Sequence, residues 1–268
     1  MKKKTKIILI ILALVIVGLS AVVWWQYGNI KAIYYGLKYS SEDIDSRMAH
    51  THDDVKKYLE SNPQYKVRPT EPVEEELHKE GMITDGELTD MIMGETSVEE
   101  VFGTQIELSE EKKLTITDSG QILDKDSAEK LKTEAKKEKE EQGISEKDEK
   151  DSKVDNSQKI SEYVAQLYVL KSNFVSRLEG LYNQAISDYM AMTPEQRKSN
   201  GKTTIANKYY SSAASMEAEC DSKVSSILSE LKILLSEQGS DMTLVDRIKM
   251  SYYEEKSLKK AYYVNKLK

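Results

Sequence analysis

The longest apolar run of the chain lies close to its N-terminus. Residues Ile7 to Trp25 include nothing more polar than Ser20, and four lysines lie just before them. In a helix this run covers about 28 Å, roughly the thickness of a bilayer's hydrocarbon core. A cleaved signal peptide is the competing interpretation, but its apolar core usually spans only about 7–15 residues. The pattern therefore predicts a retained single-pass membrane helix with a cytoplasmic N-terminus and an extracytoplasmic bulk.

Two long patterns at helical spacing occupy the C-terminal part. Apolar residues recur roughly every 3.6 positions from Ile160 to Met192 and again from Ile205 to Leu234. Thr193-Pro194 between them is typical of a helix start, and the short connection makes the two helices antiparallel neighbours. A third, shorter helix follows Gly239. The sequence thus predicts a coiled-coil-like hairpin or three-helix bundle.

Shorter patterns fill the middle of the chain and predict an all-α fold with one small β-hairpin near 112–123. A helix is expected over about 42–60, and Thr84 and Ser97 begin Ser/Thr-x-x-Glu capping boxes of short helices. The predicted segments are a basic head (1–6), an anchor (7–25), a juxtamembrane interfacial helix (26–41), an acidic, mostly helical region (42–123), a charged helix with a linker (124–157) and the C-terminal helices (158–268).

Composition narrows the class of protein. The net charge is −7, and the acidic residues are concentrated in 42–156, so nucleic acid is not an expected partner. Cys220 is the single cysteine, which excludes an intramolecular disulfide. Because the chain also has no N-glycosylation sequon, a bacterial envelope protein is favoured.

Candidate chemistry is sparse. His50 and His52 are two positions apart, so in one helix they face different sides, and a solvated surface is the favoured interpretation of this cluster. Asp124-Lys125-Asp126 lacks the glycine and the final glutamate of a calcium loop. Cys220 lies on the apolar stripe of its helix, as a buried structural thiol would. No catalytic, cofactor or metal site is predicted.

One surface on the last predicted helix suggests binding. Tyrosine pairs alternate there with lysines, and adjacent helix positions point about 100° apart, so one ring of each pair lies nearer to solvent. The predicted interaction residues are Tyr253, Lys256, Lys259, Lys260 and Tyr263.

The resulting functional hypothesis is a non-enzymatic, membrane-anchored interaction or scaffold protein on the extracytoplasmic side. Its C-terminal helices are expected to dock a protein partner or a second copy of the chain. The alternative is a module that binds a cell-wall polymer or glycan through the Tyr/Lys surface. An envelope hydrolase is the third hypothesis, and it would require a concave site that no motif indicates.

Overall fold

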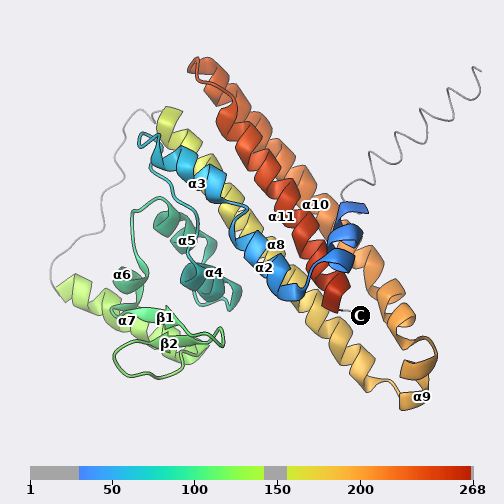
Figure 1. Cartoon of the computed structure of the whole chain (residues 1–268). Coiled ribbons are helices and arrows are strands. Elements are labelled where there is room, and N and C mark those ends of the chain that lie inside the picture. Colours follow the sequence, from blue (N-terminus) through green and yellow to red (C-terminus); the bar gives the residue numbers. More distant parts are fainter. Residues whose placement is uncertain (1–29, 142–155, 267–268) are drawn as a thin grey trace, which may run out of the picture. The chain divides into compact units, whose positions relative to one another are not determined.

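The part of the chain that the structure describes is mostly helical, with one small antiparallel sheet (Figure 1). The computed structural model describes residues 30–141 and 156–266. Its contacts divide the described chain into two compact units, one made of residues 30–55 with 246–266 and the other of residues 56–245. The predicted all-helical class with a small hairpin and long C-terminal helices is confirmed at this level.

The smaller unit joins the first described helices to the last one. Residues 30–38 are helical, α2 spans Ser41–Ala49, and α11 spans Thr243–Lys266. The Ser40 hydroxyl accepts from the Asp43 amide at 3.1 Å while the Asp43 carboxylate accepts from the Ser40 amide, which fixes the start of α2. The core of the unit consists of Ile44, Leu258 and Ala261, with Tyr35, Tyr39, Met48 and Tyr262 packed around them.

The helix expected over 42–60 is interrupted. α2 ends before His50, and α3 begins at Asp53 and runs to Glu60. The Thr51 hydroxyl donates to the Met48 carbonyl at 2.7 Å, a local bond that competes with continuation of the helix. The prediction of one continuous helix was wrong here. A polar residue in a helical pattern can lie on the helix surface or bond to the backbone where a helix ends, and the pattern alone does not distinguish the two.

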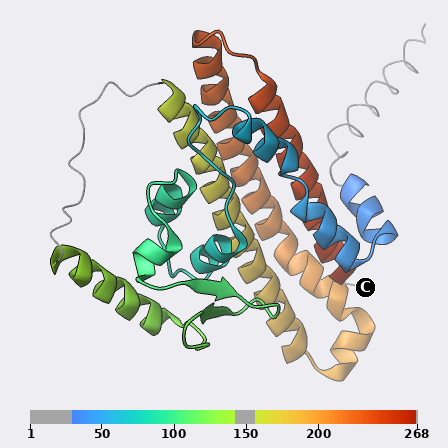
Figure 2. The same cartoon turned by 60° about the vertical axis from the view of Figure 1, so that its left-hand side comes forward.

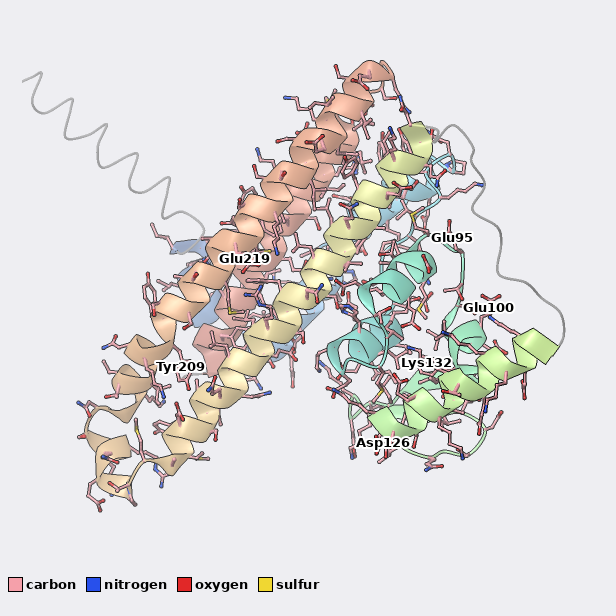
Figure 3. All side chains as sticks on the ribbon, turned by 180° about the vertical axis from the view of Figure 1, so that it is seen from behind. Glu95, Glu100, Asp126, Lys132, Tyr209 and Glu219 are labelled. Carbon is pink, nitrogen blue, oxygen red and sulfur yellow. The ribbon has the colours of Figure 1, made fainter. Side chains whose placement is uncertain are left out.

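The larger unit begins with a small subdomain, which we define as α4 to α7 with the sheet. It contains α4 (Pro72–Lys79), α5 (Asp85–Ile92), α6 (Val98–Phe102), β1 (Ile106–Leu108), β2 (Leu114–Ile116) and α7 (Lys125–Glu141). Both predicted capping boxes are present, at Thr84 with Glu87 and at Ser97 with Glu100. Lys132 of α7, labelled in Figure 3, donates to the Glu87 carboxylate of α5 at 2.8 Å.

The two strands form the small sheet, which lies beside α7 (Figure 2). β1 and β2 pair antiparallel, with Leu108 opposite Leu114. The sequence predicted that the strand at Leu114 pairs with residues after Gly120. In the structure this strand pairs instead with Ile106–Leu108, which precede it. Only an isolated bridge between Thr115 and Ile122 remains on the predicted side.

The long hairpin is formed by α8 (Asn156–Ala191) and α10 (Lys202–Glu237). Each has 36 residues, equivalent to about 54 Å of helix. Ion pairs join Arg177 to Glu219 and Asp188 to Lys208. Residue numbers therefore rise along α8 in the direction in which they fall along α10. The helices are therefore antiparallel, with α9 (Pro194–Gln196) and a π-helical turn (Arg197–Gly201) between them.

The prediction of a single-pass membrane protein is corrected. Within residues 30–141 and 156–266, no helix combines the length and the apolar composition needed to cross a membrane. α8 and α10 are long enough, but charged side chains such as Arg177 and Glu219 interrupt them. The predicted span 7–25 and the linker after 142 lie outside the described residues. The membrane and envelope location deduced from that span therefore has no support in the structure.

Candidate functional site

A buried histidine joins the small subdomain to α8. The His78 side chain is only 5% exposed, and its Nδ1 lies 2.7 Å from Ser172 Oγ. Its Nε2 lies 2.7 Å from an Asp85 carboxylate oxygen, which also accepts from the Asn173 amide at 3.2 Å. Burial raises the pKa of Asp85, but the hydrogen bonds from His78 and Asn173 outweigh it and hold that pKa below its ordinary value.

A second histidine makes a similar array in the smaller unit. His52 Nε2 lies 2.8 Å from the Glu255 carboxylate, and its Nδ1 lies 3.1 Å from Ser251 Oγ. The solvated surface expected for this cluster therefore describes His50, whose side chain is 73% exposed, but not His52. Sequence reasoning missed His52 because it assumed an unbroken helix across the cluster.

Both arrays contain the serine, histidine and carboxylate types of a nucleophilic triad, but their geometry favours a structural role. Acyl transfer needs an accessible hydroxyl and free backbone donors beside it. Ser172 and Ser251 are only 6% and 7% exposed, and both lie inside helices, where backbone N–H groups already bond within the helix. The Ser251 hydroxyl also donates to the Thr51 carbonyl at 2.7 Å. Each array thus joins two segments through polar contacts.

The predicted Tyr/Lys surface lies along α11 and is less exposed than expected. Tyr253 is 51% exposed, whereas Lys256, Lys259, Lys260 and Tyr263 are half-buried. The structure brings Lys256 within 5.8 Å of the centre of the Tyr253 ring and within 5.7 Å of the Tyr252 ring. Lys259 instead lies over Tyr262 at 5.9 Å. The platform that is open to solvent therefore centres on Tyr253 and Lys256.

Polar contacts seat the small subdomain on one side of α8. Lys171 bonds Glu75 at 3.1 Å, and Lys79 pairs with Glu179 at 3.3 Å. Together with the hydrogen bond between His78 and Ser172, these two ion pairs form a row along two turns of α8. We call this side of α8, from Lys171 to Glu179, the seating face.

Beyond the seating face, the distal part of the hairpin exposes three large apolar side chains. Ile186 is 37% exposed, Met190 is 64% exposed, and Tyr210 of α10 is 74% exposed. Ile186 and Met190 are four positions apart and share one face of α8. We call these three residues the distal patch.

The antiparallel register places all three side chains on the same side of the hairpin. Tyr209, labelled in Figure 3, donates across the seam to Asp188, so Tyr210 lies level with the turn of α8 that carries Ile186. Tyr210 is turned about 100° out of the seam relative to Tyr209. Ile186 is turned out of α8's seam in the same rotational sense. Because the two helices run in opposite directions, these two rotations turn the Tyr210 and Ile186 side chains toward the same side of the hairpin.

The rim of the distal patch is basic. Arg197 at the hairpin end donates to the Met190 carbonyl at 3.4 Å, and its guanidinium lies 3.6 Å from the Met190 sulfur. Lys198 beside it is exposed. Between Asp188 and Lys208 the bases outnumber the acids, with Arg197, Lys198, Lys202 and Lys208 against Asp188 and Glu195. The tip is thus locally basic in an acidic chain.

A second apolar stripe is exposed in the smaller unit. Ile30, Ile33, Tyr34 and Leu37 recur on one face of the helix at 30–38 and are 48–67% exposed. Its opposite face packs inward through Ala32, which is 1% exposed, and Lys31 pairs with Glu254 of α11.

The distal patch was not predicted. The stripe recognised in the sequence runs through Ala185 and Tyr189, the seam positions, and leaves out Ile186 and Met190 one step further round. Their spacing of four was the signal that identifies a second, narrower apolar face.

No protein-family model matches the sequence, and neither a curated protein nor a solved structure matches the chain.

Proposed function

We propose that the protein is a non-enzymatic helical interaction protein that docks another protein through the distal patch. The supporting observation is the grouping of Ile186, Met190 and Tyr210 on one side of the hairpin. Single exposed apolar residues are ordinary on protein surfaces, whereas a contiguous patch with a polar rim is typical of an interaction site. Methionine and tyrosine are also enriched at such sites.

The hairpin suits this role because its helices hold the patch rigidly. Ion pairs of Asp188 with Lys208 and of Arg177 with Glu219 fix the register of α8 on α10. A preformed surface loses less conformational entropy on binding than a flexible segment does.

The test is site-specific photo-cross-linking in cells. A photoreactive benzoylphenylalanine at Tyr210 should capture a protein, whereas the same group at Ser212 should not. Ser212 is the matched control because it is also exposed and points about 200° round the helix from Tyr210. The captured protein is then purified and titrated against the wild type and the Ile186→Glu/Met190→Glu variant.

We expect the double variant to bind about tenfold or more weakly, since two buried apolar contacts become charged. Both side chains are exposed in the free protein, so its helical circular dichroism should be unchanged. Equal capture at Tyr210 and Ser212, or equal affinity of the variant, would contradict the proposal.

A second candidate function is glycan or polymer binding by α11. Tyr253 packs edge-on against Tyr252 at 5.3 Å, with the Lys256 ammonium near both rings. Exposed aromatic rings beside cations can stack on sugar rings and pair with anionic groups. Retention of the full chain on immobilised anionic polysaccharide should fall for Tyr253→Ala and stay unchanged for Tyr210→Ala.

A further inference from the structure

We infer that the element docked on the distal patch is an acidic amphipathic helix lying along α8 in line with α4. This inference rests on the proposed docking function and names the chemical class of its partner. Its support comes from the continuity of the patch with the seating face, from the kind of helix already seated there, and from the charge around the patch.

The distal patch continues a surface that is already used for helix docking. Ser172, Glu179 and Ile186 are seven positions apart along α8, so they lie on one face two turns apart. The first two contact His78 and Lys79 of α4. Ile186 lies beyond these contacts with α4 and is 37% exposed. The same face is therefore occupied up to Glu179 and open beyond it.

α4 shows which chemistry this face accepts. It buries Leu77 completely and presents Glu75 to Lys171 of α8. Glu71, Glu74, Glu75 and Glu76 lie at or next to its first turn, so it is an acidic amphipathic helix. Lys171 of α8 pairs with Glu75, whereas Glu179 of α8 pairs with Lys79, so this face holds α4 through charges of both signs.

The distal patch offers cations beside apolar side chains, as Lys171 does for Glu75 of α4. Ile186 and Met190 supply the apolar contact, and Arg197 and Lys198 supply the cations at its rim. Complementary charge steers association and disfavours partners of like charge. From Glu179 to Met190, α8 offers about 16 Å of surface, or roughly three turns for a docked helix.

The experiment uses the full chain and two fluorescent synthetic helical peptides. Both carry leucine at i, i+3, i+4 and i+7, and the remaining positions are glutamate-rich in one peptide and lysine-rich in the other. Anisotropy titrations at low salt should show the glutamate-rich peptide binding about tenfold tighter. Ile186→Ser/Met190→Ser should abolish binding of either peptide, because it removes the apolar contact without adding charge.

Two further variants separate charge from apolar contact. Arg197→Gln/Lys198→Gln should reduce the preference for the glutamate-rich peptide by about three- to tenfold. Ser212→Glu, on the other side of α10, should change nothing. Circular dichroism of each variant checks that the hairpin is intact.

Equal or tighter binding of the lysine-rich peptide by the wild type overturns the inference, as does binding that survives Ile186→Ser/Met190→Ser. So does a dimer of the chain, or binding to phosphatidylserine vesicles, that the same double variant abolishes. Failure here is distinguishable from failure of the proposed function. If the peptides do not bind but Tyr210 still captures a protein that Ser212 does not, docking stands and only the acidic-helix class falls.

Discussion

The two halves of the α8–α10 hairpin share one sequence pattern but are stabilised differently. In the proximal half, Ile160 and Val164 of α8 and Leu231 and Leu235 of α10 are at most 1% exposed. In the distal half, the stripe positions Ala185, Tyr189 and Met192 are only half-buried, and an exposed ion pair joins Asp188 to Lys208 across the helices. The comparison shows that helical periodicity determines which face is apolar and leaves open how completely that face is covered.

The difference bears on the proposed docking function. A half whose apolar face is covered serves stability, because burial removes that surface from water. A half whose apolar face is open carries a cost in water that binding a partner would offset. The proposed docking site lies in the second half for this reason.

The largest expected effect tests the covered half against the open one. Leu231→Ala should lower the free energy of unfolding by about 2–5 kcal/mol, since it removes a fully buried side chain and leaves a cavity. Met190→Ala, at 64% exposure, should change it by less than about 0.5 kcal/mol. Urea unfolding followed by circular dichroism measures both. Similar losses for the two variants would show that the halves are stabilised alike.

Local signals predicted much of the fold. Capping boxes at Thr84 and Ser97, the Thr193-Pro194 helix start and the two long stripes each depend on neighbouring residues, and all appear in the structure. Pairing of β1 with β2 depends on which segment meets Leu114, and a short apolar strand carries too little pattern to decide that. At the break, the Thr51 hydroxyl bonds the Met48 carbonyl and the His50 ring bonds the Asp53 carboxylate, local contacts that a helical pattern does not indicate.

The candidate site was harder to predict because it depends on tertiary contact. Nothing in the sequence near His78 indicates that Ser172 lies 2.7 Å away, 94 positions along the chain. Whether Ile186 is covered depends on where α4 ends along α8, which is a property of the packed subdomain. The Tyr/Lys surface stays a prediction, with Tyr253 its most exposed member.

Substitutions of two glycines by alanine are expected to have smaller effects on stability, and of opposite sign. A methyl group at Gly201 would lie 3.1 Å from the Gln196 carbonyl oxygen and 3.1 Å from the Tyr189 ring. Since a backbone oxygen cannot move aside cheaply, Gly201→Ala should lower stability by about 1 kcal/mol. At Gly180, inside α8, nothing lies within 4 Å of the added methyl group, so Gly180→Ala should raise stability by about 0.5–1 kcal/mol.

Thermal and urea unfolding of both variants measures this contrast. Stabilisation by both substitutions would mean that the connection between the helices is looser than the structure shows. Destabilisation by both would mean that Gly180 has a packing role in α8. Either result would change the comparison between a rigid hairpin end and an ordinary helix interior.

The smallest expected effect concerns pH and the ion pairs of the more open half. Hydrogen bonds from Arg177 and Lys223 lower the pKa of Glu219 from 4.5 to about 2. Because the folded-state pKa is the lower one, this pair stabilises the hairpin fully above pH 4.5. Its contribution is lost as the pH falls from there toward 2.

The melting temperature of Glu219→Gln should therefore lie below that of the wild type at pH 6 and approach it at pH near 2. The pair is solvent-exposed, so about 0.5 M salt should shrink the difference at pH 6 as well. Glu195→Gln is the control, since within the described residues Glu195 makes no ion pair. A difference in melting temperature between Glu219→Gln and the wild type that persists at pH 2 would show that Glu219 acts through packing. The open half of the hairpin would then be stabilised in the same way as the covered half.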